Sequence, residues 1–150
     1  MNPNPSKTHA QWLWLLLAIF VVRVIAQPLA LILETPLLPR FESWHSGVLP
    51  YPALVVAQLL IIAWFARTSS RFGNGEVVPR RRRGVFFLFF GSVYFLTMFA
   101  RLVLGLTVYR ESRWFTSYIP TVFHLVLASW LLLYGHYHYR YGSPSANIRR

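Results

Sequence analysis

The sequence predicts an all-α integral membrane protein, a bundle of four transmembrane helices whose N- and C-termini are cytoplasmic. Of its 150 residues, 55% are hydrophobic and only 13% are charged. Ordinary soluble domains carry about 25% charged residues, so this composition favours a chain whose apolar surface is covered by lipid. Four apolar runs are each long enough to cross a bilayer as a helix. We therefore expect residues 1–150 to form a single membrane domain.

The first apolar run, residues 11–33, carries a charge near its middle. Placing Arg23 there costs roughly 2.5–3.5 kcal/mol on the membrane-insertion scale. Arg23, Gln27, Ala30 and Glu34 share one helical face, since they are spaced by three or four residues. This polar stripe predicts a helix that turns its arginine toward other helices rather than toward lipid.

The segments on either side of this run are expected to lie outside the bilayer. Residues 1–9 are polar and are predicted to be loose up to the membrane. A cleavable signal peptide is the alternative for this region, but Arg23 interrupts the apolar run and Pro28 follows closely. Pro28 is also expected to bend the helix. The connection 34–49 is apolar enough to lie along the membrane surface.

The second predicted helix spans residues 50–67, with Pro50 and Pro52 in its first turn and Gln58 near its middle. The hydrophilic connection 68–83 follows and ends in four consecutive arginines. We predict that these arginines contact anionic lipid headgroups; docking to an acidic protein is the alternative. They are Arg80, Arg81, Arg82 and Arg83.

The third predicted helix, 84–107, is rich in phenylalanine and has a polar or small face. That face holds Tyr94, Thr97, Arg101 and Gly105.

The fourth predicted helix, 115–135, repeats the same spacing. Its polar or small face holds Ser117, Thr121, His124 and Ala128. The segment 136–141 that follows is aromatic and basic, a composition typical of the headgroup zone of a bilayer.

Orientation follows from the distribution of positive charge. The N-terminus, the connection 68–83 together with Arg67 just before it, and the C-terminus carry ten lysine and arginine residues, and the other two connections carry three. The positive-inside rule then places both termini in the cytoplasm, most simply in a bacterial inner membrane.

Polar groups in hydrocarbon need partners, so the four stripes are expected to meet in the bundle centre. There they would form a pocket for an amphipathic guest with an anionic or carbonyl head, such as a phospholipid, a fatty acid or a quinone. The alternative is structural: Arg23 pairs with Glu34 or Glu42, Arg101 reaches the outer surface, and His124 only packs. The ligand-binding candidates are Arg23, Gln27, Gln58, Tyr94, Arg101 and His124.

Composition argues against several kinds of chemistry. The chain has no cysteine and four acidic residues, all glutamates, which disfavours thiolate and carboxylate-rich metal sites. No metal or other cofactor is predicted. A b-type haem is not expected, because no second histidine lies at the depth of His124. Nucleic acid is not expected as a partner despite the net charge of +11, since no basic soluble module is present.

These observations favour a non-catalytic accessory subunit, or a lipid- or quinone-binding subunit, of a larger membrane complex. One alternative is a membrane-embedded enzyme acting on a lipid-like anionic substrate in the outer half of the bilayer. Its proton-transfer residues would be Glu42, His45 and His124. The other alternative is an oligomeric transporter or channel.

Overall fold

The computed structural model describes residues 5–33, 50–109 and 117–142, and these residues form four α-helices without a strand. The helices are α1 (Pro5–Leu33), α2 (Tyr51–Gly73), α3 (Arg81–Thr107) and α4 (Tyr118–Tyr141). Each one is long and apolar enough to cross a membrane. The predicted all-α class with four membrane-span-like helices is therefore confirmed.

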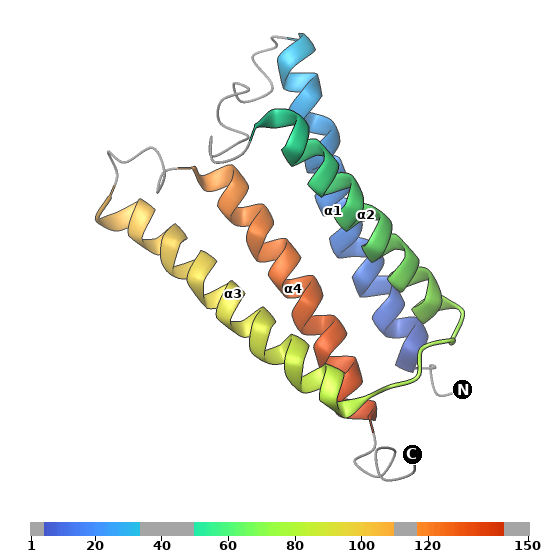
Figure 1. Cartoon of the computed structure of the whole chain (residues 1–150). Coiled ribbons are helices and arrows are strands. Elements are labelled where there is room, and N and C mark those ends of the chain that lie inside the picture. The colour runs from blue at the N-terminus through green and yellow to red at the C-terminus, as the bar shows by residue number, and fades with distance from the viewer. Residues whose placement is uncertain (1–4, 34–49, 110–116, 143–150) are drawn as a thin grey trace.

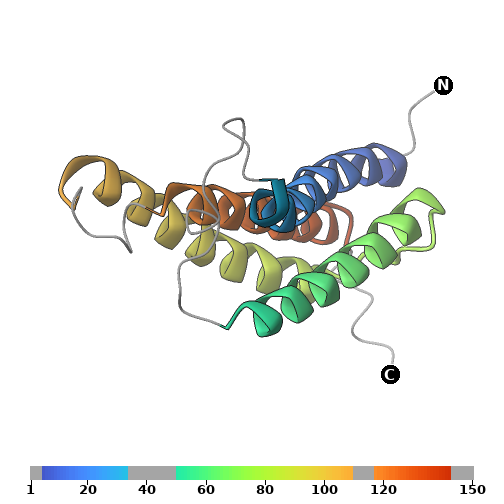
Figure 2. The same ribbon diagram turned by 90° about the horizontal axis from the view of Figure 1, so that it is seen from above.

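The helices run alternately up and down, so the start of α1 and the end of α4 lie at one end of the bundle (Figure 1). We call this end, where α1 begins and α4 finishes, the terminal end, and the opposite end the loop end. In Figure 1 the pair α1–α2 and the pair α3–α4 converge toward the terminal end and diverge toward the loop end. Seen from above, α1 and α4 lie on one side of the bundle, and α2 and α3 lie on the other (Figure 2).

Helices α3 and α4 pack along their whole length because glycines allow their backbones to approach closely. A Cβ atom at Gly84 would clash with the backbone of Tyr139, and one at Gly135 would lie 2.8 Å from the backbone nitrogen of Leu88. Near the loop end, the Tyr118 hydroxyl donates a hydrogen bond to the carbonyl of Gly105 at 3.2 Å. Small residues at such contacts are the usual means by which membrane helices pack tightly.

The core of the bundle is richest at the terminal end, where α1 and α4 meet the last turns of α2. Phe72 is fully buried there, and its ring contacts the ring of Tyr137 with centroids 4.7 Å apart. The hydroxyl of Ser6 donates a hydrogen bond to the Phe72 carbonyl at 2.6 Å. The hydrogen bond joins the first turn of α1 to the last turn of α2, and the ring contact joins α2 to α4.

Three helices extend further at the terminal end than the apolar runs predicted. Helix α1 begins at Pro5 rather than residue 11, so the prediction of a loose segment through residue 9 was wrong. Helix α2 continues to Gly73 rather than ending at 67, and α3 begins at Arg81 rather than 84. The apolar run marks only the part suited to hydrocarbon, whereas packing against neighbouring helices prolongs the backbone hydrogen bonding.

Helix α4 shows the same effect. It continues to Tyr141 rather than ending at 135. Tyr137 and His138 are 5% and 1% exposed, so these two side chains are buried between helices, whereas the location of the segment 136–141 in the headgroup zone stays a prediction. His136 and Tyr139 are exposed, as that prediction requires.

Candidate functional site

The polar side chains predicted within the helices come together in the half of the bundle nearer the loop end. Arg23, Gln27, Gln58 and Arg101 are each less than 10% exposed although each lies on an apolar helix. Each of the four helices contributes at least one polar group to this region, which we call the polar cluster. It consists of Arg23, Gln27, Gln58, Tyr94, Arg101 and His124.

Two hydrogen bonds within the polar cluster join helices in pairs. The hydroxyl of Tyr94 on α3 lies 2.5 Å from Nδ1 of His124 on α4. The amide Nε2 of Gln58 on α2 donates to Oε1 of Gln27 on α1 at 3.4 Å. Each bond therefore satisfies one polar group on each of two helices, which lowers the cost of burying them in a low-dielectric interior.

Arg23 connects these two pairs. Its guanidinium carbon lies 5.7 Å from the centroid of the Phe123 ring on α4, a cation–π geometry. It also lies within electrostatic range of His124. Arg101 on α3 interacts electrostatically with the same imidazole. Two guanidinium groups from different helices thus lie near one histidine.

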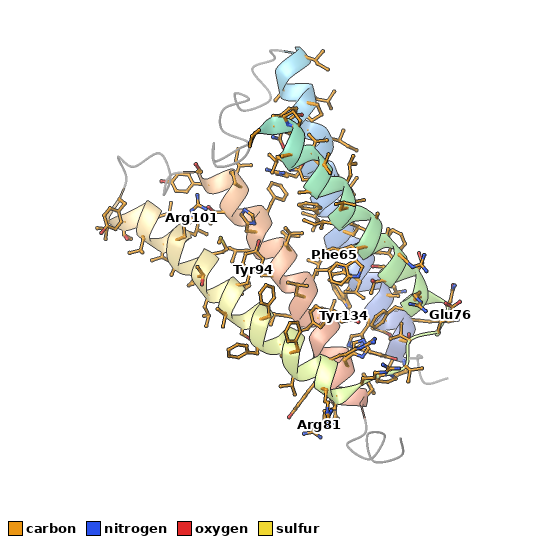
Figure 3. The ribbon with its side chains drawn as sticks, in the orientation of Figure 1. Phe65, Glu76, Arg81, Tyr94, Arg101 and Tyr134 are labelled. Atoms are coloured by element: carbon orange, nitrogen blue, oxygen red, sulfur yellow. The ribbon has the colours of Figure 1, made fainter. Side chains whose placement is uncertain are left out.

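The position of Arg101 is visible in Figure 3, where it lies near the loop end of α3 and Arg81 lies at the opposite end of the same helix. Tyr94 lies between them. Arg101 is 7% exposed, so it is buried against other parts of the protein.

An apolar groove adjoins the polar cluster. It has a volume of about 260 Å³ and lies between α2, α3 and α4. Six of the nine residues that line it are aromatic, and the other three are aliphatic. They are Ile61, Trp64, Phe65, Phe86, Phe87, Phe90, Tyr94, Leu127 and Leu131.

Tyr94 belongs to both features. Its ring lines the groove, and its hydroxyl lies against His124 in the polar cluster. Along α3, the groove residue Phe86 lies about 12 Å from Tyr94 on the terminal side, and Arg101 lies about 10 Å further toward the loop end, at about 1.5 Å per residue. The site is therefore amphipathic along the helix axis, with an apolar groove at one end and cationic groups at the other.

The inner wall of the groove is held rigid by stacked aromatic rings. Phe65 on α2 stacks on Trp130 of α4 with ring centroids 3.7 Å apart and an interplanar angle of 10°. Trp130 in turn stacks on Tyr134 at 5.6 Å. On the open side, Trp64 and Phe90 are 45% and 52% exposed, so the groove opens laterally between α2 and α3.

Other predicted residues lie elsewhere. Thr97, expected on the inward face of its helix, is exposed and donates a hydrogen bond to its own Val93 carbonyl at 2.8 Å. That prediction was wrong, because a step of three residues rotates Thr97 about 60° away from Tyr94, to the edge of the inward face, and threonine can satisfy its hydroxyl locally.

The four arginines Arg80–Arg83 are exposed at the terminal end, far from the polar cluster along the helices. Arg81 lies over the Tyr139 ring at 4.8 Å and donates a hydrogen bond to the Tyr139 hydroxyl at 3.4 Å. The backbone N–H of Arg80 donates to Nδ1 of the buried His138 at 3.1 Å. This bond fixes the start of α3 against α4, a structural role for a histidine that we had assigned to the headgroup zone.

The remaining predicted residues, Glu34, Glu42 and His45, lie outside the described residues. Within the described ranges, histidine and acidic side chains form no group of three or more that could hold a metal ion.

Two features of the site were missed in the sequence. Gly84, Gly91 and Gly105 are separated by seven and fourteen residues, a spacing that indicates the face of α3 that packs on α4 and that could have been recognised. The groove itself could not have been recognised, because the phenylalanines of α3 lie on all sides of that helix. Only the tertiary packing determines which of them contact Trp64 on α2. No family model, curated protein or solved structure matches the chain.

Proposed function

We propose that this protein is an integral membrane protein that binds one amphipathic lipid, with its apolar chain in the groove and its head at the polar cluster. The observation that carries the proposal is the dual position of Tyr94, which lines the groove and contacts His124. Ligand sites are typically apolar cavities with a few convergent polar groups, and this arrangement has both parts.

Membrane insertion is supported by the exposed surface. Large apolar side chains on all four helices face outward, among them Val22 on α1, Leu60 on α2 and Phe89 on α3, which are 66%, 67% and 73% exposed. Exposed apolar surface on this scale would not be stable in water. Hydrocarbon would cover it and would also supply the ligand laterally, through the open side of the groove.

The orientation of the bundle is part of the proposal. The terminal end carries Arg80–Arg83, exposed, together with Lys7 and Arg140. The positive-inside rule then places the terminal end in the cytoplasm, and a bacterial inner membrane is the setting that we propose. The polar cluster would lie in the outer half of the bilayer.

A protein that binds a lipid can also be a subunit of a larger membrane complex. The accessory-subunit prediction is therefore compatible with lipid binding. Gentle extraction followed by native mass spectrometry tests both together. We expect one lipid per chain to remain bound under detergent conditions that remove all loosely bound lipid. Stoichiometric copurification of another membrane protein would support a subunit role. A lipid-free chain with full secondary structure would contradict the proposal.

A further inference from the structure

The amide of Gln27 has a buried hydrogen-bond donor that no described residue satisfies. Gln27 is fully buried, and its Oε1 accepts a hydrogen bond from Gln58. Its donor atom, Nε2, is buried as well and has no hydrogen-bond partner among the described residues. A buried donor without an acceptor is costly, so an acceptor oxygen supplied by a ligand would be favourable at this position.

The buried arginines of the polar cluster do not create the same need. Arg23 and Arg101 both interact with other groups of the protein. The group that a ligand can complete is therefore the neutral amide of Gln27, which requires an acceptor oxygen but no charge.

This amide lies close to the loop end of the groove. Gln58, its hydrogen-bond partner, comes three residues before the groove residue Ile61 on α2. Residues three apart on a helix are neighbours on its surface, and here the step along the axis is about 4.5 Å. A ligand chain that lies against Ile61 therefore ends beside the Gln27–Gln58 pair.

The Tyr94–His124 pair provides a second donor at the same end of the groove. Tyr94 lines the groove itself, and His124 comes three residues before the groove residue Leu127 on α4. If the tyrosine hydroxyl donates to Nδ1, a neutral imidazole carries its proton on Nε2; if Nδ1 donates, the hydroxyl hydrogen points elsewhere. Either way, the pair has an N–H or O–H beyond the bond that joins it.

We propose that the lipid bound by this site is a quinone with a single apolar chain, whose carbonyl oxygens accept hydrogen bonds from Gln27 and from the Tyr94–His124 pair; this inference rests on the proposed function. A quinone head has two carbonyl acceptors and no donor, which matches donors on α1 and on the α3–α4 pair. A fatty acid or a phosphate ester brings a negative charge that the amide does not require.

The lining and the volume of the groove also suit a quinone. Six of the nine lining residues are aromatic, among them Phe90 and Tyr94, whose ring centroids lie 6.3 Å apart. Aromatic faces favour contact with a planar ring. The volume of about 260 Å³ lies just below the range of about 300–1,000 Å³ that is usual for small-molecule sites, which favours one chain over two.

The test uses ligands that share one decyl chain and differ in the head. Delipidated full-length protein is titrated with decylbenzoquinone, decylbenzene, decanoic acid and decyl phosphate, and occupancy is measured by native mass spectrometry. Decylbenzene has a planar ring without carbonyl oxygens, so its comparison with the quinone measures the hydrogen bonds. We expect decylbenzoquinone to bind about tenfold more tightly than decylbenzene, and more tightly than either anionic ligand.

Removing the Gln27 amide should weaken the recognition of the head alone. The double variant Gln27→Leu/Gln58→Leu replaces both hydrogen-bond partners by apolar groups, a change that can be nearly neutral for stability. We expect the affinity ratio of decylbenzoquinone to decylbenzene to fall about threefold or more, and continued binding of decylbenzene would show that the groove is intact. Gln11→Leu, which replaces an exposed glutamine on α1, should leave the ratio unchanged.

Each contrary result has a distinct meaning. Equal affinity for the quinone and decylbenzene, or tighter binding of either anionic ligand, would overturn the quinone assignment while leaving the lipid groove intact. An unchanged affinity ratio in the folded double variant would overturn the role of Gln27. Failure of every ligand to bind would contradict the proposed function itself. If the double variant does not fold, as judged by circular dichroism, the comparison of the four heads on the wild-type protein decides.

Discussion

The hydroxyl of Tyr94 on α3 lies 2.5 Å from Nδ1 of His124 on α4, at the boundary between the apolar groove and the polar cluster. This hydrogen bond has two consequences. It satisfies two polar groups inside an apolar bundle, and it holds the ring of Tyr94 in the wall of the groove. Stability and ligand binding should therefore both depend on it.

Removing the hydroxyl tests this bond directly. We expect Tyr94→Phe to lower the free energy of unfolding by about 0.5–1.5 kcal/mol, with the lower part of that range typical of hydrogen bonds between membrane helices. Unfolding in a titration with sodium dodecyl sulfate, followed by circular dichroism, measures the change. The matched control is Tyr141→Phe, in which the tyrosine is exposed at the terminal end. Equal losses in the two variants would show that the Tyr94 hydroxyl has no special role.

The close contact between α3 and α4 leads to a second prediction, on the stability of the bundle. Gly84→Ala places a methyl group against the Tyr139 backbone, which cannot move as a flexible side chain can. We expect a loss of about 1–3 kcal/mol, as in other overpacked interfaces, measured by the same unfolding titration. Gly73→Ala is the control, since nothing lies within 4 Å of its added Cβ. It should be neutral or should stabilise by up to about 1 kcal/mol. An unaffected Gly84→Ala protein would contradict the close packing.

The orientation of the bundle can be tested because the chain has no cysteine. Single variants Asn74→Cys and Val108→Cys place exposed thiols at the terminal end and the loop end, respectively. In intact cells, a membrane-impermeant maleimide should label Val108→Cys and should label Asn74→Cys only after permeabilisation. The reverse pattern would place the polar cluster in the cytoplasmic half of the membrane.

Much of the fold could be predicted because the signal is a property of composition along the chain. Long apolar runs identify all four helices, and the burial of Arg23 and Gln27 follows from the cost of polar groups in hydrocarbon. The helix ends were predicted less well. The hydrogen bond from Ser6 to Phe72 and the burial of His138 depend on contacts with neighbouring helices. The hydropathy pattern within one segment contains no information about such contacts.

The site could be predicted only in part for a related reason. Spacing placed Tyr94 and His124 on inward faces, and the structure joins them. The same reasoning failed for Thr97, which faces outward. The stack of Phe65 on Trp130 forms between helices that are far apart in sequence, so no local pattern reveals it.

The most direct test of the central claim is to fill the groove and measure bound lipid. Ile61 lines the groove, whereas its neighbour Leu60 is 67% exposed on another face of α2. Native mass spectrometry of gently extracted protein should show one bound lipid per chain in the wild type and in Leu60→Trp, and little or none in folded Ile61→Trp. Equal lipid occupancy in the two tryptophan variants would contradict binding in this groove.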